Sequence, residues 1–294
     1  MIGHKYFGDL SSGGKIGNQL FEYAALFNIA KKNNYQFGFS EKQIEYFRKC
    51  FLFRSAEILS HEEYLDRARI MTHRAEDPPI DLTVLDAKDN TLLEGFFQSE
   101  QYFEDSIDEL KRELSYHPVR LSAAQTVIRD LKYQSDNDIV SVHYRKGDYV
   151  LNDFPCLPVE YYLRSFAEFE PDRTTFIICS DELKTAKEVF DAVAATAGKD
   201  YNIILSPYSE DVGPEFWNVK GEQTNSRASW NPVIDMSIMS MSDHCIIANS
   251  SLSWWGSWFY DRPGKRVLAP PIWFKGVKTA DSAIRRDKWE IIEF

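Results

Sequence analysis

The most informative stretch of this chain is Ile139-Val140-Ser141-Val142-His143-Tyr144-Arg145-Lys146-Gly147-Asp148-Tyr149. Its first four residues are rich in β-branched side chains, which predicts a short buried strand. The strand leads into three side chains that can carry positive charge, His143, Arg145 and Lys146, then a glycine and a carboxylate. In α/β proteins, ligands bind outside the carboxyl ends of the strands. The stretch therefore predicts charged side chains at the mouth of a binding cleft.

These charges allow two interpretations. As an anion clamp, Arg145 offers a planar fork to a phosphate or carboxylate, and Lys146 adds a mobile charge. Gly147 would let a ligand approach the backbone closely. In the alternative, the charges only solvate the end of a strand, and Asp148 pairs with one of them, as surface ion pairs commonly do. The stretch by itself leaves both interpretations open.

Strands and helices alternate regularly after this stretch. The pattern predicts strands at 175–179, 202–205, 245–248 and 266–269, and helices at 159–169, 181–197, 231–241 and 251–260. Such alternation indicates an α/β fold with a parallel sheet wound on both faces.

Two polar loops, Ser180-Asp181 and Asn249-Ser250-Ser251, each follow a predicted strand and precede a predicted helix. Parallel strands bring their carboxyl ends to one edge of a sheet, so we expect both loops to converge on Arg145. The free backbone amides of helix N-termini attract phosphate at such an edge. The alternative is that these residues simply cap their helices, as serine, aspartate and asparagine commonly do.

The first half of the chain carries a strand and helix pattern of its own. Residues 5–7 predict a short strand, and the glycine-rich loop Gly8 to Gly17 leads to a helix from Asn18. The loop matches neither the nucleotide phosphate loop nor the dinucleotide fingerprint. We therefore expect two domains, residues 1–134 and 135–294, with a cleft between them.

Composition and charge exclude several classes of protein. The net charge is -11, whereas nucleic-acid and anionic-membrane binders need a basic face, so a local cluster must hold any anionic ligand. No stretch approaches the roughly 20 apolar residues of a spanning helix, and the start lacks a signal-peptide core. We expect a cytoplasmic protein with no transmembrane segment, which leaves peripheral membrane association open. The four cysteines lie far apart and suggest neither a zinc knuckle nor a disulfide framework.

Two other motifs favour structural roles. Asp136-Asn137-Asp138 has the Asp-x-Asp form that can hold a divalent cation, but it precedes the central strand and should lie at the opposite end of the sheet. A turn is the favoured interpretation, and we expect no metal site. Trp254, Trp255, Trp258 and Phe259 share one helical face, which favours core packing over stacking on a sugar.

Together these blocks resemble the α-1,2-fucosyltransferase family, a family of inverting glycosyltransferases that use GDP-fucose. The resemblance covers most of the chain, and the block Ala248 to Gly256 is its most specific part. The matching blocks are Gly13 to Gln19 with the following helix, Gly95 to Phe103, His143 to Tyr149, Leu157 to Tyr162, Ser180-Asp181 and Ile246 to Trp258. The last of these contains the most specific part. Their order and spacing carry the resemblance.

The resemblance implies a GT-B fold, in which two Rossmann-like domains face each other across a cleft and the C-terminal domain binds the donor nucleotide. It implies transfer of L-fucose from GDP-fucose to the 2-hydroxyl of a galactose-containing glycan, with no metal and no other cofactor. Many animal members carry an N-terminal membrane anchor. This chain shows none, so we expect a cytosolic bacterial or viral type.

The resemblance also implies roles for individual residues. Arg145 would bind the donor diphosphate, and His143 and Asp148 would shape that site. The residues implied to line the rest of the donor pocket are Ser180, Asp181, Asn249, Ser250 and Ser251. Those implied to face the cleft from the acceptor domain are Gly17, Asn18 and Gln19.

Two features depart from the family pattern. A second arginine is common where Lys146 stands, and lysine keeps the charge but loses the bidentate fork. Residues 207–230 match no part of the family. For catalysis we expect Arg145 and Lys146 to stabilise the leaving GDP. Asp148 is the first candidate for a general base and Asp9 the second, unless bond cleavage runs well ahead of attack and no base is needed. The alternatives are another linkage, such as α-1,6, or a glycan-binding protein without catalysis.

Overall fold

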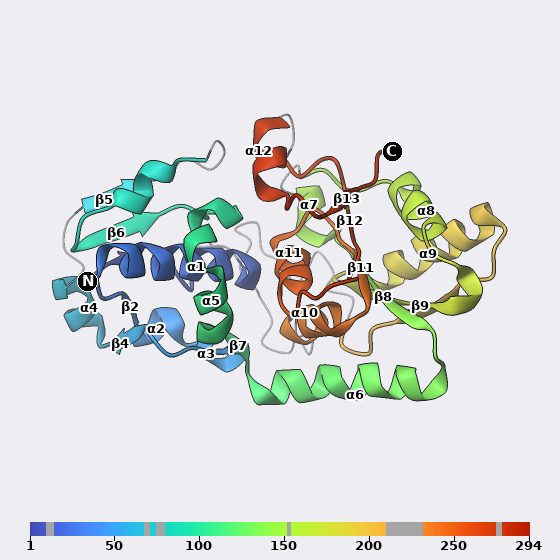
Figure 1. Ribbon diagram of the computed structural model, residues 1–294, viewed down its shortest axis with the longest axis horizontal. Helices are drawn as coiled ribbons and strands as arrows, with labels where there is room; N and C mark the ends of the chain where they lie inside the picture. Colours follow the sequence, from blue (N-terminus) through green and yellow to red (C-terminus); the bar gives the residue numbers. More distant parts are fainter. Residues whose placement is uncertain (10–14, 68–70, 75–79, 152–153, 210–231, 275–277) are drawn as a thin grey trace. The chain divides into compact units, whose positions relative to one another are not determined.

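The computed structural model describes residues 1–9, 15–67, 71–74, 80–151, 154–209, 232–274 and 278–294 (Figure 1). The chain forms two compact units. Unit 1 comprises Met1–His117 and Val277–Arg286, and unit 2 comprises Pro118–Gly276 and Asp287–Phe294.

The units divide after His117, whereas we predicted a boundary after residue 134. Residue 134 is instead the end of helix α6 (Pro118–Gln134). This helix packs against α10 (Pro232–Met241), and its contacts therefore place it in unit 2. A local pattern shows where a helix ends, but only packing shows which core the helix joins.

Unit 2 is built on a six-stranded, wholly parallel sheet with the order β10-β9-β8-β11-β12-β13. Its strands are β8 (Asp138–Tyr144), β9 (Thr174–Ser180), β10 (Asn202–Leu205), β11 (His244–Ile246), β12 (Val267–Ala269) and β13 (Glu290–Ile291). The chain runs from β8 through β9 to β10 on one side and then returns to add β11, β12 and β13 on the other. Strand order therefore switches between β8 and β11, which is where open α/β sheets bind ligands.

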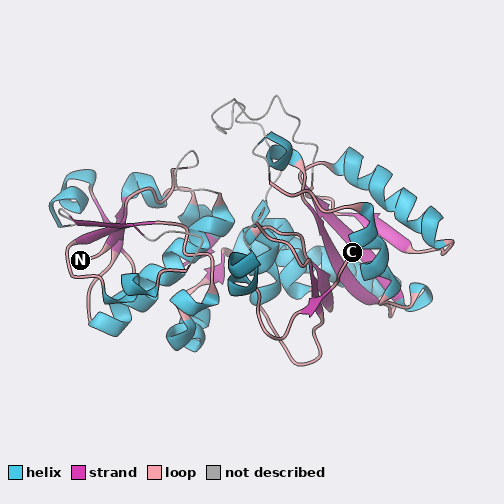
Figure 2. Ribbon diagram, turned by 90° about the horizontal axis from the view of Figure 1, so that it is seen from above, coloured by secondary structure: helices cyan, strands magenta, loops and turns pink. Residues whose placement is uncertain are grey.

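The two central strands are buried almost throughout, as expected where helices cover both faces of a parallel sheet. Every residue of β9 is buried, and so is every residue of β8 after Asp138. Figure 2 shows the strands of this sheet flanked by helices. The α-helices in the described part of unit 2, besides α6 and α10, are α7 (Gly147–Leu151), α8 (Val159–Ala167), α9 (Leu183–Ala197) and α11 (Ser251–Trp258).

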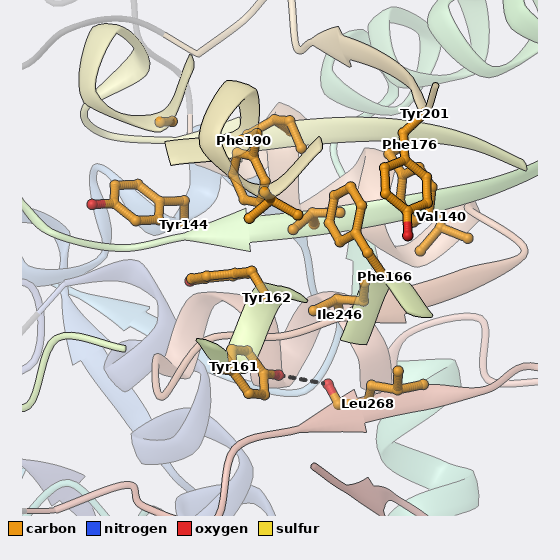
Figure 3. Packing of buried hydrophobic residues seen from close by; sticks show 14 of the residues in the cluster. Val140, Tyr144, Tyr161, Tyr162, Phe166, Phe176, Phe190, Tyr201, Ile246 and Leu268 are labelled. Atoms are coloured by element: carbon orange, nitrogen blue, oxygen red, sulfur yellow. Dashed lines mark hydrogen bonds between the residues drawn. The ribbon is translucent and has the colours of Figure 1, made fainter. Parts of the chain in front are cut away.

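Aromatic rings fill the space between this sheet and the α8–α9 pair (Figure 3). Phe166 of α8 stacks on Phe176 of β9 with ring centroids 4.0 Å apart, and Phe190 of α9 packs against Phe166 at 5.5 Å. On α11, Trp254, Trp255 and Trp258 are fully buried, which confirms core packing as their use.

Unit 1 contains smaller parallel sheets. One has the order β1-β6-β5, another pairs β2 with β4, and a bridge between Ile2 and Phe37 runs parallel as well. Its strands are β1 (Gly3–His4), β2 (Gly38–Ser40), β3 (Phe51–Leu52), β4 (Glu57–Leu59), β5 (Met71–Arg74), β6 (Thr91–Glu94) and β7 (Ser115–Tyr116), with β3 and β7 antiparallel. Its α-helices are α1 (Ile16–Asn33), α2 (Glu41–Ile44), α3 (Phe47–Cys50), α4 (His61–Arg67), α5 (Ile107–Glu113) and α12 (Lys278–Ile284).

The predicted α/β class with parallel sheets is confirmed in both units. The predicted strand at residues 5–7 is wrong, because β1 is Gly3–His4 and the chain then turns, with the Asp9 amide donating to the Tyr6 carbonyl at 3.0 Å. Phe7 is buried in this turn against Phe39, with ring centroids 4.1 Å apart. Tertiary packing thus overrides a local strand pattern.

The described part of the chain also bears on two predictions, that there is no transmembrane segment and that the cysteines form no disulfide framework. None of its helices combines the length and the apolar composition needed to cross a bilayer. All four cysteines are free thiols; Cys50, Cys179 and Cys245 are buried, and Cys156 is exposed.

Candidate active site in unit 2

Three loops leave the same edge of the unit 2 sheet. β8 lies between β9 and β11, with Tyr144 opposite Ser180 and Val142 opposite Ile246 in the register. The loops that begin at Arg145, Asp181 and Ile247 therefore start beside one another. This edge holds the switch in strand order, so the topology itself makes it the candidate site.

Arg145 forms a buried ion pair with Asp181 of the neighbouring loop. The two residues are 8% and 1% exposed, so this pair lies well inside the protein. The backbone N–H of Lys146 also donates to Asp181 Oδ1, at 3.3 Å. A buried carboxylate with these partners holds the guanidinium in one orientation.

Gly147 leaves the space that this ion pair occupies. A Cβ atom at this position would overlap the Asp181 carboxylate. The glycine therefore makes room for Asp181, and the close ligand approach that the anion-clamp interpretation gave it stays a prediction. Asp148 stands in α7, but its side chain lies outside the described residues.

His143 lies at the end of β8 and is fully enclosed. Burial, together with the nearby Arg145 charge, lowers the pKa of His143 to about 3, so the imidazole is neutral at physiological pH. Within the described residues its Nδ1 atom has no hydrogen-bond partner. His143 therefore offers a neutral hydrogen-bonding group, whereas the sequence pattern allowed it to be a cation.

The Asn249-Ser250-Ser251 loop opens helix α11. Ser250 is the N-cap residue by position, yet its side chain makes no capping hydrogen bond. The amide of Asn249 is occupied: Nδ2 donates to the carbonyls of Pro155 at 2.9 Å and Trp273 at 3.3 Å. The first-turn N–H groups of α11 and the two serine hydroxyls are thus the donors this loop presents. Uncapped N–H groups at a helix start favour an anion.

Two other residues predicted on the donor side differ in their surroundings: hydrogen bonds hold Ser180, whereas Lys146 is partly exposed. The Ser180 hydroxyl accepts from the Glu182 N–H at 2.9 Å, and the Ser180 N–H donates to the Ser209 hydroxyl at 2.9 Å, so Ser180 shapes its own turn. Lys146 is partly exposed, and among the described side chains none forms an ion pair with its ammonium. A partly exposed lysine next in sequence to a fixed guanidinium is an arrangement suited to a diphosphate.

Three tyrosines support this edge, and the sequence did not single them out. The Tyr149 hydroxyl donates to the Asn249 carbonyl at 2.6 Å, and the Tyr149 ring lies 5.3 Å from the Arg145 guanidinium carbon. From α8, the Tyr162 hydroxyl donates to the His143 carbonyl at 3.1 Å and the Tyr161 hydroxyl to the Ile247 carbonyl at 2.7 Å. The only available signal was the position of these tyrosines in the matching blocks, because a hydroxyl's partner depends on tertiary contacts.

The residues predicted on the acceptor side lie in the first turn of α1, in unit 1. Gly17 and Gln19 are buried, and Gln19 is 0% exposed. Asn18 is partly exposed, and its Oδ1 atom accepts from Gln98 Nε2 at 3.0 Å. Of these three predicted residues, Asn18 is therefore the one whose side chain can meet a ligand. Asp9, the second candidate base, is exposed next to a segment outside the described residues.

Two further predictions concern metals and the unmatched loop. The described residues contain no group of three His, Cys, Asp or Glu side chains placed to hold a metal ion. Asp138 begins β8, so Asp136 and Asp138 stand at the amino end of this strand, opposite the candidate site. Residues 210–230 of the loop 207–230 lie outside the described residues.

Sequence comparisons identify a family model and two relatives that match this chain. The model of glycosyl transferase family 11 matches residues 6–293. The chain is 27% identical over 207 residues to an alpha-1,2-colitosyltransferase of Escherichia coli, covering 68% of this chain and 61% of that protein. It is 30% identical over 156 residues to the O-antigen biosynthesis glycosyltransferase WbnK of Escherichia coli, covering 51% and 43%. The matches thus span about half of the length of these relatives.

Structure comparison finds fucosyltransferases. The fucosyltransferase NodZ from Bradyrhizobium matches with a TM-score of 0.47 and 12% identity, covering 82% of this chain and 88% of that chain. POFUT1 in complex with GDP matches with a TM-score of 0.49 and 11% identity, covering 94% and 98%. The family assignment itself comes from the sequence model, which spans nearly the whole chain. The predicted family is confirmed, and this protein belongs to glycosyl transferase family 11.

Proposed function

We propose that this protein is an inverting glycosyltransferase that moves L-fucose from GDP-fucose to the 2-hydroxyl of a galactose-containing glycan, without a metal. The observation that carries the proposal is the set of donors at the unit 2 switch point. It combines the buried guanidinium of Arg145, the partly exposed Lys146 and the uncapped start of α11. These groups suit the charge that develops on a departing nucleoside diphosphate.

The proposed reaction forms one bond and breaks another at the sugar C1 atom. The acceptor hydroxyl oxygen attacks C1, the bond from C1 to the phosphate oxygen breaks, and GDP leaves with the electron pair. Arg145 is already oriented by Asp181, so no reorganisation is needed when charge appears on the leaving group. The hydroxyl proton passes to a base or to water, and Asp148 and Asp9 stay the candidate bases.

His143 has a distinct place in this proposal. Because its pKa is lowered to about 3, it adds no positive charge to the diphosphate site. A neutral imidazole beside Arg145 can still donate or accept one hydrogen bond from the nucleotide. Charge stabilisation thus falls to Arg145, Lys146 and the start of α11.

One observation favours a second candidate. A relative at 27% identity is named alpha-1,2-colitosyltransferase, which makes colitose an alternative sugar for the same site. Parallel assays with GDP-fucose and GDP-colitose decide between the two donors. Preferred turnover of GDP-colitose would replace the sugar in our proposal and leave the diphosphate chemistry unchanged.

The experiment that tests the proposal is a transfer assay with GDP-fucose, EDTA and a panel of β-galactosides. We expect a fucosylated product in the presence of the chelator, with an α-1,2 linkage by product analysis. An α-1,6 linkage would move the protein to the other predicted linkage class. Glycan binding without GDP affinity or turnover would instead support a non-catalytic protein. Activity only with an added divalent cation would overturn the metal-free mechanism and return attention to Asp136 and Asp138.

A further inference from the structure

We propose that Tyr149 is a positioning residue of the diphosphate site, which fixes Arg145 and the start of α11 relative to each other. This inference rests on the proposed function, because it concerns how the same site is held. Tyr149 lies one short turn after the cations, in α7, and its N–H donates to the Lys146 carbonyl at 2.8 Å. It is thus tied to the cation loop through its own backbone.

The Tyr149 hydroxyl connects that loop to the next one. It donates to the Asn249 carbonyl at 2.6 Å, a short bond between residues 100 positions apart in the chain. The carbonyl belongs to the peptide that joins Asn249 to Ser250, directly before the uncapped helix start. Asn249 Nδ2 is held by Pro155 and Trp273 as well, so the loop is fixed at both its side chain and its carbonyl. The hydroxyl therefore orients the peptide that leads into the anion-binding turn.

The Tyr149 ring acts on Arg145. The guanidinium carbon lies 5.3 Å from the ring centroid, within the range of a cation–π contact. Asp181 holds the same guanidinium through an ion pair. Phe154 packs on the Tyr149 ring with centroids 5.1 Å apart, which limits the movement of the ring itself. A guanidinium with both contacts loses little further conformational freedom when a diphosphate binds.

Two substitutions separate these contacts. Tyr149→Phe removes the hydrogen bond to Asn249 and keeps the ring, and we expect a weakening of GDP binding of about fivefold, as for one hydrogen bond. Tyr149→Leu removes the hydroxyl and the ring, and we expect a loss of about thirtyfold as the cation–π contact goes as well. The acceptor KM should not change in either variant.

Tyr144 provides a matched control from the same stretch of chain. It ends β8, and its ring packs against Tyr162 and Phe190. Its hydroxyl makes no hydrogen bond within the described residues. Tyr144→Phe therefore makes the same chemical change without breaking a contact, and we expect GDP binding to be unchanged.

The test is isothermal titration of the full chain with GDP, with donor and acceptor KM measured in the transfer assay. A double-mutant cycle adds a second measurement, the coupling between two substitutions in GDP affinity, which a merely structural role of Tyr149 would leave at zero. If the ring acts through Arg145, the effect of Tyr149→Leu shrinks when Arg145 is replaced by methionine, which has no charge to place over the ring. Wild-type affinity in Tyr149→Leu, or effects that simply add to those of Arg145→Met, would overturn the inference alone. A wild-type protein that does not bind GDP would overturn the proposed function and this inference with it.

Discussion

The starts of α11 in unit 2 and α1 in unit 1 present different chemistry. At the sheet edge that leads into α11 stand a buried ion pair, Arg145 with Asp181, and the partly exposed Lys146. At α1 the described contact is between two amides, Gln98 and Asn18. The two helix starts thus differ in the contact beside them, which is a buried ion pair at α11 and a hydrogen bond between two amides at α1.

The buried ionisable groups near α1 strengthen this contrast. Burial lowers the pKa of His4 to about 4, so its imidazole is neutral at physiological pH, and burial raises the pKa of Glu22 well above its ordinary value, which favours the neutral carboxyl. Their closest atoms, His4 Nδ1 and Glu22 Oε2, lie 3.6 Å apart. A charged site suits a diphosphate, whereas a neutral amide suits a sugar hydroxyl. The Asn18 amide is therefore the group at which the acceptor role expected of unit 1 can be tested, and Arg145 is the group for the proposed donor role of unit 2.

The largest effect is expected for Arg145→Ala, which removes the fixed cation of unit 2. Transfer should fall by about two orders of magnitude or more, the usual cost of losing a preorganised donor. The substitution also leaves the Asp181 carboxylate buried without its guanidinium, a change that typically costs about 3–5 kcal/mol. Steady-state kinetics and urea unfolding measure the two effects.

A double variant separates these effects. Arg145→Ala with Asp181→Asn removes the buried charge together with its partner, so stability should recover while activity stays low. Near-normal transfer in Arg145→Ala would contradict the assignment of charge stabilisation to unit 2.

Gly147→Ala should have the next largest effect, because a Cβ there would overlap the Asp181 carboxylate. Displacing Asp181 would release Arg145, and we expect GDP affinity to fall by about tenfold, the order of a strained contact of about 1–3 kcal/mol. Titration with GDP measures it. Val150→Ala is the control, since Val150 is 61% exposed in the same turn. Unchanged affinity in Gly147→Ala would show that Asp181 is not needed to hold the guanidinium.

Gln98→Glu tests the neutral side of the comparison. A carboxylate only accepts hydrogen bonds, so Asn18 would have to turn its NH2 group toward position 98 and present its carbonyl instead. We expect the acceptor KM to rise by about fivefold, as for one reversed hydrogen bond, with GDP affinity unchanged. Gln101→Glu, at an exposed position nearby, adds the same charge without touching Asn18. Equal effects of both variants would argue against a role for Asn18 at the acceptor.

The smallest effect on transfer is expected for Glu113, a buried carboxylate of unit 1 whose contribution is to stability. Glu113 accepts from the Tyr23 hydroxyl at 2.6 Å, the Ser55 hydroxyl at 2.7 Å, and the N–H groups of Arg54 and Ser55 at 2.8 Å each. Burial alone would raise the pKa of Glu113, but these hydrogen bonds outweigh it and the pKa is lowered. A lowered pKa stabilises the fold above the unfolded-state pKa, and this stability is lost as pH falls through the folded-state pKa.

Acid unfolding of the wild type and of Glu113→Gln measures this contribution. The wild type should lose more stability than the variant as pH falls below about 4.3, the ordinary pKa of glutamate. Identical pH profiles would show that the charge of the Glu113 carboxylate does not contribute to the stability of unit 1.

The amino-acid sequence alone was enough to predict the main elements of unit 2 and the family. The β-branched runs of β8 and β9 predict buried parallel strands because both faces of such strands are covered. Polar residues directly after these strands then had to lie at one edge of the sheet. The short elements between Glu41 and Arg74 were less predictable, since their strands gain stability from pairing, as β3 does with the distant β7.

The side chains that meet at that edge could be identified only from the folded chain. Asp181 is the partner of Arg145 because the register sets Tyr144 opposite Ser180, and Gly147 is required because Asp181 lies against it. Tyr149 reaches Asn249 across 100 positions of sequence. Local patterns specify backbone conformation and burial, whereas side-chain partners depend on strand register and packing between distant segments.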